Sequence, residues 1–387
     1  MIEDAQMLLD RLVGFPSVSS ESNLDLIDFV ESYLDSHGIR AVRVHDDKQA
    51  KAAIYANIGP EVEDGVVLSG HSDVVPVDGQ AWDTNPFVLT ERDGKLFGRG
   101  TCDMKGFVAL SLAAVPLALE RDITRPIQIA ISYDEEIGMT GAPKLIDHML
   151  NNGMPKAKAV IVGEPSRMDI INAHNGGFGY EVSFRGFEVH SSIMHKGVSA
   201  VMMAARLIEW ANQMNERGAS SKPAGLSKQF DPHYTTVHVG KISGGTALNI
   251  TAKNCDFVID FRVVPGDDFA EWMAAFEAEV AQLDAQMKNV HPDTGIDCFQ
   301  DFYAPGLMPE ENGPARELVA ELTGANTSRV VSFLTEGGLF QERGYSTIVC
   351  GPGNIAQAHQ PNEFISIEQF HKGAEFMSRL VDKLDQH

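Results

Sequence analysis

Four apolar runs in this chain, each typical of a buried strand, lead to histidine or acidic side chains. The runs and the residues that follow them are 66–70 before His71, 129–134 before Glu135 and Glu136, 159–163 before Glu164, and 347–350 before a Gly-Pro-Gly loop that reaches His359. A fifth stretch, 98–102, leads to Asp103. Ligands of open α/β sheets bind beyond the carboxyl ends of the strands. The pattern therefore predicts an α/β fold with a site for two divalent metals, and it points to hydrolysis.

The composition limits the classes of partner. A chain of 387 residues has enough material for two or three domains at about 150 residues each. It contains 31 Lys plus Arg against 54 Asp plus Glu, which gives a formal charge of −23. A nucleic acid or an anionic membrane would favour a basic surface, so we expect neither as a partner. The acidity is typical of a solvated, soluble surface.

Three features predict a cytoplasmic location. No run approaches the ~18 apolar residues that a transmembrane helix needs. Residues 1–6 are acidic and lack the basic region of a signal peptide. Cys102, Cys255, Cys298 and Cys350 are far apart and form no Cys-x-x-Cys pair, which favours free thiols in a reducing compartment over a disulfide framework.

The pattern of apolar and polar residues along the chain changes twice. Residues 38–172 alternate apolar strands with helices, as βαβ units do. From about 174 to 303 the order becomes β-α-β-β-α-β, which is that of a ferredoxin-like unit. From about residue 306 to 387, the pattern typical of a parallel sheet then returns. We therefore predict a catalytic di-metal domain over 1–173 and 304–387, a mixed sheet flanked by helices, with an inserted α+β domain over 174–303.

The candidate ligands have ordinary structural explanations that must be weighed. Most single histidines are structural, Asp103 could serve only as a helix N-cap, and Glu135-Glu136 could be a solvated turn. His71 differs because Asp73 follows at i+2, where an extended segment would let it accept the ring N–H. Adjacent acids also suit a metal site, since one can bind a metal while the other contacts a water molecule held by the metal.

Charge supports a two-metal site. Two divalent cations bring four positive charges, which Asp103, Glu136, Glu164 and a bridging hydroxide would offset. Imidazole and carboxylate ligands without thiolates suit two zinc ions, with cobalt or manganese as substitutes. Two such metals, ~3.5–4 Å apart, lower the pKa of a bridging water and polarise the carbonyl under attack.

These residues lie in motifs that resemble a known family. The motifs are Ser69-Gly70-His71-Ser72-Asp73-Val74-Val75-Pro76, Trp82 with Pro86-Phe87, Gly98-Arg99-Gly100-Thr101-Cys102-Asp103-Met104-Lys105-Gly106, Asp134-Glu135-Glu136-Ile137-Gly138 and Gly163-Glu164-Pro165. Together they are similar to the acetylornithine deacetylase and succinyl-diaminopimelate desuccinylase family, a group of two-zinc aminoacylases and carboxypeptidases. The resemblance runs nearly from end to end.

The resemblance implies a role for each candidate ligand. Asp103 corresponds to the carboxylate that bridges the two metals. His71 and Glu164 complete one metal site, and Glu136 and His359 complete the other. The implied fold, a zinc-binding sheet domain with an inserted lid domain that dimerises, agrees with the domain organisation predicted from the pattern above.

The resemblance also implies catalytic residues. Glu135 corresponds to the general base that takes a proton from water and returns it to the leaving amine, and Asp73 would support His71. His190, in the segment 187–192, corresponds to a lid histidine that stabilises the oxyanion, often from the partner subunit of a homodimer. His195 is a nearby competitor for that role, and spacing alone would make either one an ordinary surface histidine.

Two further lid residues are implied to contact the substrate. Asn249 ends the segment 244–249, and Arg262 ends the segment 260–262. Arginine suits a substrate carboxylate because it donates two parallel hydrogen bonds. An arginine at the end of a strand is equally often part of a surface ion pair.

Two C-terminal segments, 334–340 and 351–363, are most similar to the acetylornithine deacetylase subgroup. The subgroup often has Asp at the position of Asn362. Glu336, beside Gly337, could pair with the cationic side chain of a substrate, or it could be a solvated loop acid. The expected reaction is removal of the acetyl group from N2-acetyl-L-ornithine, a small-molecule N-acyl amino acid, to give L-ornithine for arginine synthesis.

Three alternatives remain open at the level of the sequence. The first is a deacylase for another N-acyl amino acid, such as acetylcitrulline or succinyl-diaminopimelate. The second is a dipeptidase or aminopeptidase on the same fold. The third is a binding protein without activity, which the presence of Glu135 and all five candidate ligands disfavours.

Overall fold

The computed structural model describes residues 1–385, which divide into two compact units. Unit 1 contains Met1–Ala173, Leu307–Val330 and the described residues from Thr335 onward. Unit 2 contains His174–Gly306 and Val331–Leu334. The predicted insertion, 174–303, covers most of unit 2 but misses residues 304–306 and the short second segment.

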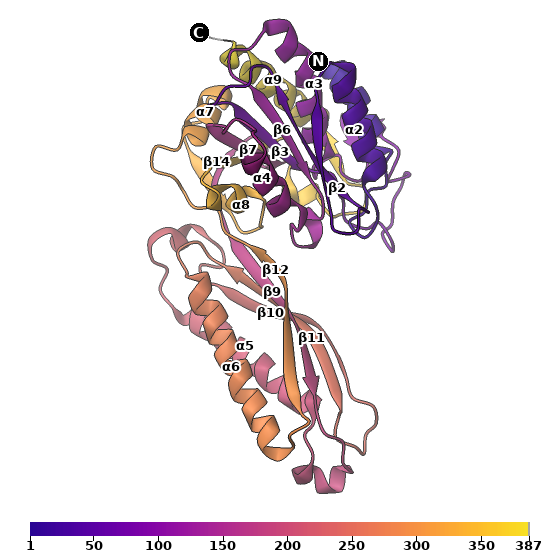
Figure 1. The fold of residues 1–387 in the computed structure, drawn as a ribbon, viewed down its shortest axis with the longest axis vertical. Helices are drawn as coiled ribbons and strands as arrows, with labels where there is room; N and C mark the ends of the chain where they lie inside the picture. Colours follow the sequence, from indigo (N-terminus) through magenta and orange to yellow (C-terminus); the bar gives the residue numbers. More distant parts are fainter. Residues whose placement is uncertain (386–387) are drawn as a thin grey trace. The chain divides into compact units, whose positions relative to one another are not determined.

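Unit 1 is built around an eight-stranded mixed sheet, which confirms the predicted α/β class (Figure 1). In chain order the strands are β1 (Ala41–His45), β2 (Ala52–Ile58), β3 (Val66–His71), β6 (Ile127–Ser132), β7 (Ala159–Pro165), β8 (Ile170–His174), β13 (Ser328–Val331) and β14 (Thr347–Gly351). Their order across the sheet is β1-β2-β6-β3-β7-β14-β8-β13. The four central strands β6, β3, β7 and β14 are parallel to one another. Their carboxyl ends therefore meet at one edge.

A small antiparallel sheet completes the strands of unit 1. It consists of β4 (Thr90–Arg92), β5 (Lys95–Phe97) and β15 (Phe364–Ser366). Phe364 pairs with Phe97 across β15 and β5. This pairing brings the segment after His359 next to the segment that leads to Asp103.

Helices cover both faces of the large sheet. They are α1 (Ile2–Val13), α2 (Leu24–Ser36), α3 (Lys105–Arg121), α4 (Gly141–Asn151), α7 (Pro314–Thr323), α8 (Gly337–Glu342) and α9 (Ile367–Leu384). Helix α3 is apolar around most of its circumference, as expected for a helix buried on all sides. It packs between the sheet and helices α1 and α9, while α4 and α8 contact each other on the opposite face (Figure 1).

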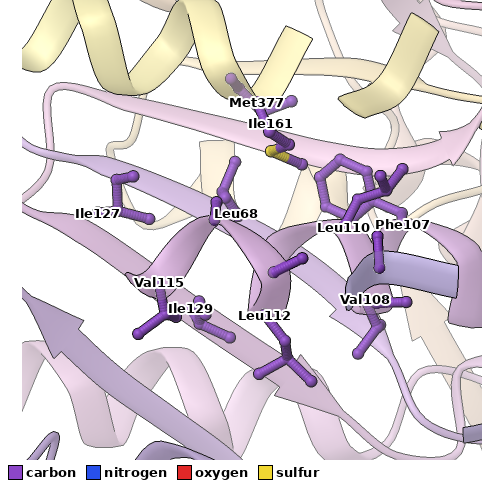
Figure 2. Close-up of a cluster of buried hydrophobic side chains, with 14 of the residues drawn as sticks. Leu68, Phe107, Val108, Leu110, Leu112, Val115, Ile127, Ile129, Ile161 and Met377 are labelled. Atoms are coloured by element: carbon purple, nitrogen blue, oxygen red, sulfur yellow. The ribbon is translucent and has the colours of Figure 1, made fainter. Parts of the chain in front are cut away.

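The core of unit 1 fixes the strand that carries Glu164. Figure 2 shows Phe107 and Leu110 of α3 beside Ile161 of β7 and Met377 of α9. Gly163 lies so close to the Phe107 ring that an added Cβ would come within 2.0 Å of it. Glycine is therefore required at 163, because only a residue without a side chain lets α3 approach β7 at this point.

Unit 2 has the predicted β-α-β-β-α-β order. Its elements are β9 (Gly176–Arg185), η2 (Ser191–Lys196), α5 (Ala200–Ser220), η3 (Gly225–Gln229), β10 (Thr236–Gly244), β11 (Asn254–Val263), α6 (Phe269–Val290) and β12 (Gly295–Ala304). The strand order is β10-β11-β9-β12, and every pairing is antiparallel. Buried and exposed residues alternate along β11, so one face of the sheet packs on α5 and α6.

Aromatic side chains dominate the core of unit 2. The rings of Phe178 and Phe261 stack with a centroid distance of 4.3 Å, and Phe276 of α6 meets Phe261 edge to face.

Within the part of the chain that the structure describes, no helix is long and apolar enough to span a membrane.

Candidate metal centre

The sheet register brings four candidate residues to the same edge of unit 1. His71 is the last residue of β3 and pairs with Ser132, the last residue of β6. Glu135 and Glu136 follow Ser132 in the short 3-10 helix η1 (Glu135–Ile137). Glu164 stands near the end of β7, on the other side of β3. The alternation of helix and strand therefore places these side chains where parallel strands end.

Asp103 lies between the two candidate histidines. Its Oδ1 is 3.1 Å from Nε2 of His71, and its Oδ2 is 3.3 Å from Nε2 of His359. Nε2 of His71 is also 3.6 Å from Oε1 of Glu164, and Nε2 of His359 is 2.9 Å from Oε2 of Glu136. One carboxylate thus faces two His–Glu pairs, as the predicted bridging position requires.

Two overlapping groups have the spacing of metal ligands. Ligand-type atoms of His71, Glu135 and Glu164 lie within 4.8 Å of one another, and so do those of His71, Asp103 and Glu136. The structure therefore brings together all five predicted ligands and the predicted base. Glu135, which belongs to the first group, has a position that suits either a ligand or a base.

Burial and crowding shift the pKa values of the carboxylates in the centre. Burial raises the pKa of Glu135 well above its usual range, with Glu164 and Glu136 adding to the rise. Burial also raises the pKa of Glu164 well above its usual range and, together with the charge on Asp103, raises that of Glu136. For Asp103 the effect of burial is outweighed by the two histidines, which lower its pKa.

The histidines show the complementary effect. Contacts with Asp103 and Glu136 raise the pKa of His359 to about 10. Burial alone would lower the pKa of His71, but Asp103 and the neighbouring carboxylates raise it well above its usual range. The surrounding field thus strongly favours positive charge at this position.

The donor set fits divalent cations. It consists of imidazole nitrogens and carboxylate oxygens, and Oε1 of Glu136 is buried with no hydrogen-bond partner among the described residues. The thiol of Cys102 points elsewhere, toward the carbonyl of Asn354 at 3.4 Å. Two cations would supply the positive charge that the field favours and would displace protons from the ligands.

Asp73 is placed differently from the prediction. The ring Nδ1 of His71 lies 2.9 Å from the backbone carbonyl of Asp73 but 3.6 Å from its carboxylate. The carboxylate instead accepts the backbone N–H groups of Glu135 (3.2 Å) and Glu136 (3.3 Å) and the hydroxyl of Ser19 (2.6 Å). The expected i, i+2 geometry fails because β3 ends at His71. Asp73 therefore orders the loop that carries the two glutamates.

Glu336 is an interior residue, not a solvated loop acid. Its side chain is only 1% exposed and accepts hydrogen bonds from Ser69 of β3, at 3.2 Å, and from Ser132 of β6. Burial raises its pKa to about 7. Gly337, also buried, begins helix α8. Both carboxylate oxygens are already engaged, so direct pairing with a substrate ammonium gains no support from this geometry.

The candidate residues of unit 2 fall at two places on its sheet. His190 precedes η2, where its Nδ1 lies 2.8 Å from the Ser192 hydroxyl, and the Asn249 carbonyl accepts the N–H of Ser191 at 2.8 Å. Both are exposed, as is His195. Arg262 lies near the far end of β11, where its Nε donates to Asp260 at 2.8 Å. The structure therefore brings His190 and Asn249 together, but not Arg262.

Three buried charged residues near the centre were not singled out from the sequence. Arg99 pairs with Glu363 at 2.7 Å, and the ammonium of Lys105 donates to the carbonyl of Phe15 at 2.7 Å. Burial lowers the pKa of Lys105 to about 7. All three lie inside the quoted motifs. The available signal was a charged residue embedded among glycines and apolar residues.

Comparison with known proteins identifies the family. The model of peptidase family M20/M25/M40 matches residues 67–383. The chain belongs to this family. It is accordingly a hydrolase of linear amide bonds, as predicted. An acetylornithine deacetylase of Myxococcus xanthus is 32% identical over 385 residues, which cover 96% of this chain and 95% of the relative.

Solved structures share the fold at lower identity. A metallo-carboxypeptidase of the M20 family, Sso-CP2 from Sulfolobus solfataricus, superposes with a TM-score of 0.78 at 17% identity and covers 99% of each chain. The YXEP protein of Bacillus subtilis, described as a dinuclear metal-binding peptidase of the M20 family, has a TM-score of 0.67 at 15% identity, with 98% of this chain and 97% of that chain covered. The M20 fold thus extends over both units.

Proposed function

We propose that the protein is a two-zinc amidohydrolase that removes the acetyl group from N2-acetyl-L-ornithine and releases L-ornithine and acetate. The observation that carries the proposal is the position of Asp103 between two His–Glu pairs at the strand edge of unit 1. The similarity to an acetylornithine deacetylase along almost the whole chain supports the substrate. We also propose a cytoplasmic location, consistent with the free cysteines.

The metals would be held by the five converging side chains. His71 and Glu164 would bind one, Glu136 and His359 the other, and Asp103 would bridge them. When bound, two such cations polarise the acyl carbonyl and make a water molecule more acidic. Zinc suits these ligands, and cobalt or manganese could substitute.

The remaining chemistry belongs to Glu135. Its carboxylate takes one proton from the attacking water, whose oxygen forms a bond to the acyl carbon. The carbon–nitrogen bond then breaks, and Glu135 returns the proton to the departing amine nitrogen. Water and the N-acyl amino acid are thereby converted to acetic acid and a free amine, which ionise to acetate and an ammonium group, with no other reactant. Asp73 assists by holding the backbone N–H groups of Glu135 and Glu136.

We propose that His190 donates a hydrogen bond to the developing oxyanion across a homodimer. Arg262 and Asn254 lie eight residues apart on β11, which corresponds to ~26 Å at ~3.3 Å per residue. His190 and Asn249 lie beyond the Asn254 end, where His190 bridges Ile250. The two sets are too far apart to reach the same small substrate from one chain. In a homodimer, the partner subunit could supply His190 and Asn249, while Arg262 would come from the chain that binds the substrate. The two sets could then reach the same substrate.

A substrate panel on metal-loaded protein tests the function. We expect acetylornithine to be hydrolysed with a higher kcat/KM than acetylcitrulline, acetylmethionine, succinyl-diaminopimelate or unblocked dipeptides. A preference for another acylated amino acid would keep the mechanism and change the substrate. Cleavage of unblocked dipeptides without deacylation would favour a peptidase, the activity named for Sso-CP2 on this fold.

A further inference from the structure

We infer that Arg99 and Glu363 are positioning residues that hold Asp103 and His359 at the spacing required by the second metal. The inference rests on the proposed two-metal site. It concerns the side of the centre formed by Asp103, Glu136 and His359, which we call the His359 side. The other side, formed by His71 and Glu164, depends on a different kind of support.

The Arg99–Glu363 pair is buried. The side chains are 0% and 1% exposed, and Nη1 of Arg99 lies 2.7 Å from Oε2 of Glu363. Removing two charges from water costs several kcal/mol each, and a buried pair is often replaceable by apolar residues without loss of stability. Stability alone is therefore a weak reason for this pair, and its other contacts indicate a positional role.

Glu363 fixes the backbone at Asp103. Its Oε1 accepts the N–H groups of Cys102 at 3.0 Å and of Asp103 at 3.1 Å. These two hydrogen bonds to a charged acceptor restrain the peptide groups that carry the predicted bridging carboxylate.

Arg99 reaches the loop that carries His359. Its Nη1 is 3.4 Å from the carbonyl of Gln360, and its Nη2 donates to the side-chain oxygen of Gln80 at 2.6 Å. The side-chain amide of Gln80 in turn donates to the carbonyl of His359 at 3.0 Å. A single buried ion pair thus connects the backbone at Asp103 with the backbone at His359, two of the three candidate ligands on the His359 side.

The His71 side is supported by the sheet. His71 is paired with β6, and Glu164 stands on β7 between β3 and β14. Ladder hydrogen bonds and the packing of Phe107 on Gly163 determine their positions. Loss of the ion pair should therefore weaken the two metals unequally, which a general loss of stability would not do.

Two substitutions distinguish a positioning role of the ion pair from a general contribution to stability. In Glu363→Gln the amide group must point its N–H donors either at the Arg99 guanidinium or at the two backbone N–H groups, so one set of contacts is lost. Gln80→Leu removes the Arg99–Gln80–His359 link, together with the acceptor of the Trp82 indole N–H at 3.1 Å, but it leaves Glu363 in place and changes no charge. Gln80 is partly exposed, so this variant should fold even if Glu363→Gln does not. Glu310→Gln is the matched control, because Glu310 accepts the Thr347 N–H at 3.0 Å in unit 1 and contacts none of the proposed ligands.

The experiment is a titration of chelator-treated full-length protein with Zn²⁺ in the presence of a competing chelator, with metal content measured by mass spectrometry. For the wild type and Glu310→Gln we expect two ions per chain. In Glu363→Gln and Gln80→Leu one ion should bind within about threefold of the wild-type affinity, and the other 10–100-fold more weakly, as is typical when a partner of a ligand is lost. Circular dichroism and Tm establish that each variant is folded.

Two outcomes would overturn the inference while the proposed function stands. One is wild-type affinity for both ions in the folded variants, and the other is an equal loss of both ions. If the wild-type protein itself failed to bind two ions, the proposed function would fail first, and the inference with it.

Discussion

The candidate metal centre of unit 1 and the candidate substrate residues of unit 2 are supported in different ways. In unit 1 the side chains of His71, Asp103 and Glu164 are buried and contact residues from distant parts of the chain. In unit 2, His190 and Arg262 are exposed, and each bonds to a side chain two residues away. Burial thus fixes these three candidate metal ligands. The groups proposed for substrate contact contribute little to folding, so substitutions there should change kcat or KM without changing metal content or stability.

The largest effect is expected for Glu135→Gln. Loss of the proton acceptor should reduce kcat by ~10²–10⁴-fold, because general acid–base catalysis contributes about that much. Both metals should remain bound, which metal analysis of the purified variant would measure. Loss of one metal would identify Glu135 as a ligand, consistent with its place beside His71 and Glu164. Near-normal kcat with both metals bound would exclude it as the base.

His190→Ala should come next. Loss of an oxyanion donor typically lowers kcat by ~10²–10³-fold, and the metal content and Tm should not change. His195→Ala is the matched control, since His195 lies in the same exposed segment, and it should retain wild-type kcat. A reversal of the two results would make His195 the donor.

Mixing the two inactive variants tests whether His190 acts across the dimer. A heterodimer of Glu135→Gln and His190→Ala contains one metal centre with an intact base and an intact histidine from the partner. Activity should therefore appear when the variants are unfolded and refolded together, and not when each is refolded alone. A mixture that stays inactive, or sedimentation that shows a fully active monomer, would contradict the in-trans proposal.

The contrast between the regions also explains what could be predicted from sequence. Strand ends in a parallel sheet converge by topology, so an apolar run before His71 or Glu164 was enough to place the side chain. The order of elements in unit 2 was predictable for a different reason. Alternation of apolar and polar residues with period two marks each of its strands.

Other features depend on tertiary contacts that no local pattern carries. The His71 ring contacts the backbone carbonyl of Asp73, and not its carboxylate, because β3 ends at His71, two residues before Asp73. Glu336 lies in a segment that reads as a loop, yet its side chain is buried and accepts hydrogen bonds from hydroxyl groups of two strands. Arg99 and Glu363 are 264 residues apart in sequence, so their pairing could not be deduced without a fold.

The dependence of stability on pH should reveal the buried carboxylate. In metal-free protein the pKa of Glu336 rises from 4.5 to about 7 on folding because of burial. Between these values the native state holds a proton that the unfolded state has lost, so the free energy of unfolding decreases as pH increases. The contribution is on the order of 3 kcal/mol, from 1.36 kcal/mol per pKa unit. In Glu336→Gln this part of the decrease should disappear, as urea unfolding at pH 4.5, 6 and 7.5 would measure. Equal slopes for the wild type and the variant would contradict the assignment.

The smallest effect is expected at the exposed end of β11. Arginine has five N–H donors, and the contact of Arg262 with Asp260 uses Nε. Arg262→Gln should therefore weaken binding of a substrate carboxylate and raise KM about tenfold, equivalent to about 1.4 kcal/mol, with kcat nearly unchanged. The methyl ester of the substrate lacks the carboxylate charge and serves as the control, since its KM should be similar for both proteins. An equal rise in KM for acid and ester would mean that Arg262 supports the strand through Asp260 and does not bind the carboxylate. That result would leave unit 2 with His190 and Asn249 as its contribution to the site, and it would remove the geometric reason for placing them in the partner subunit.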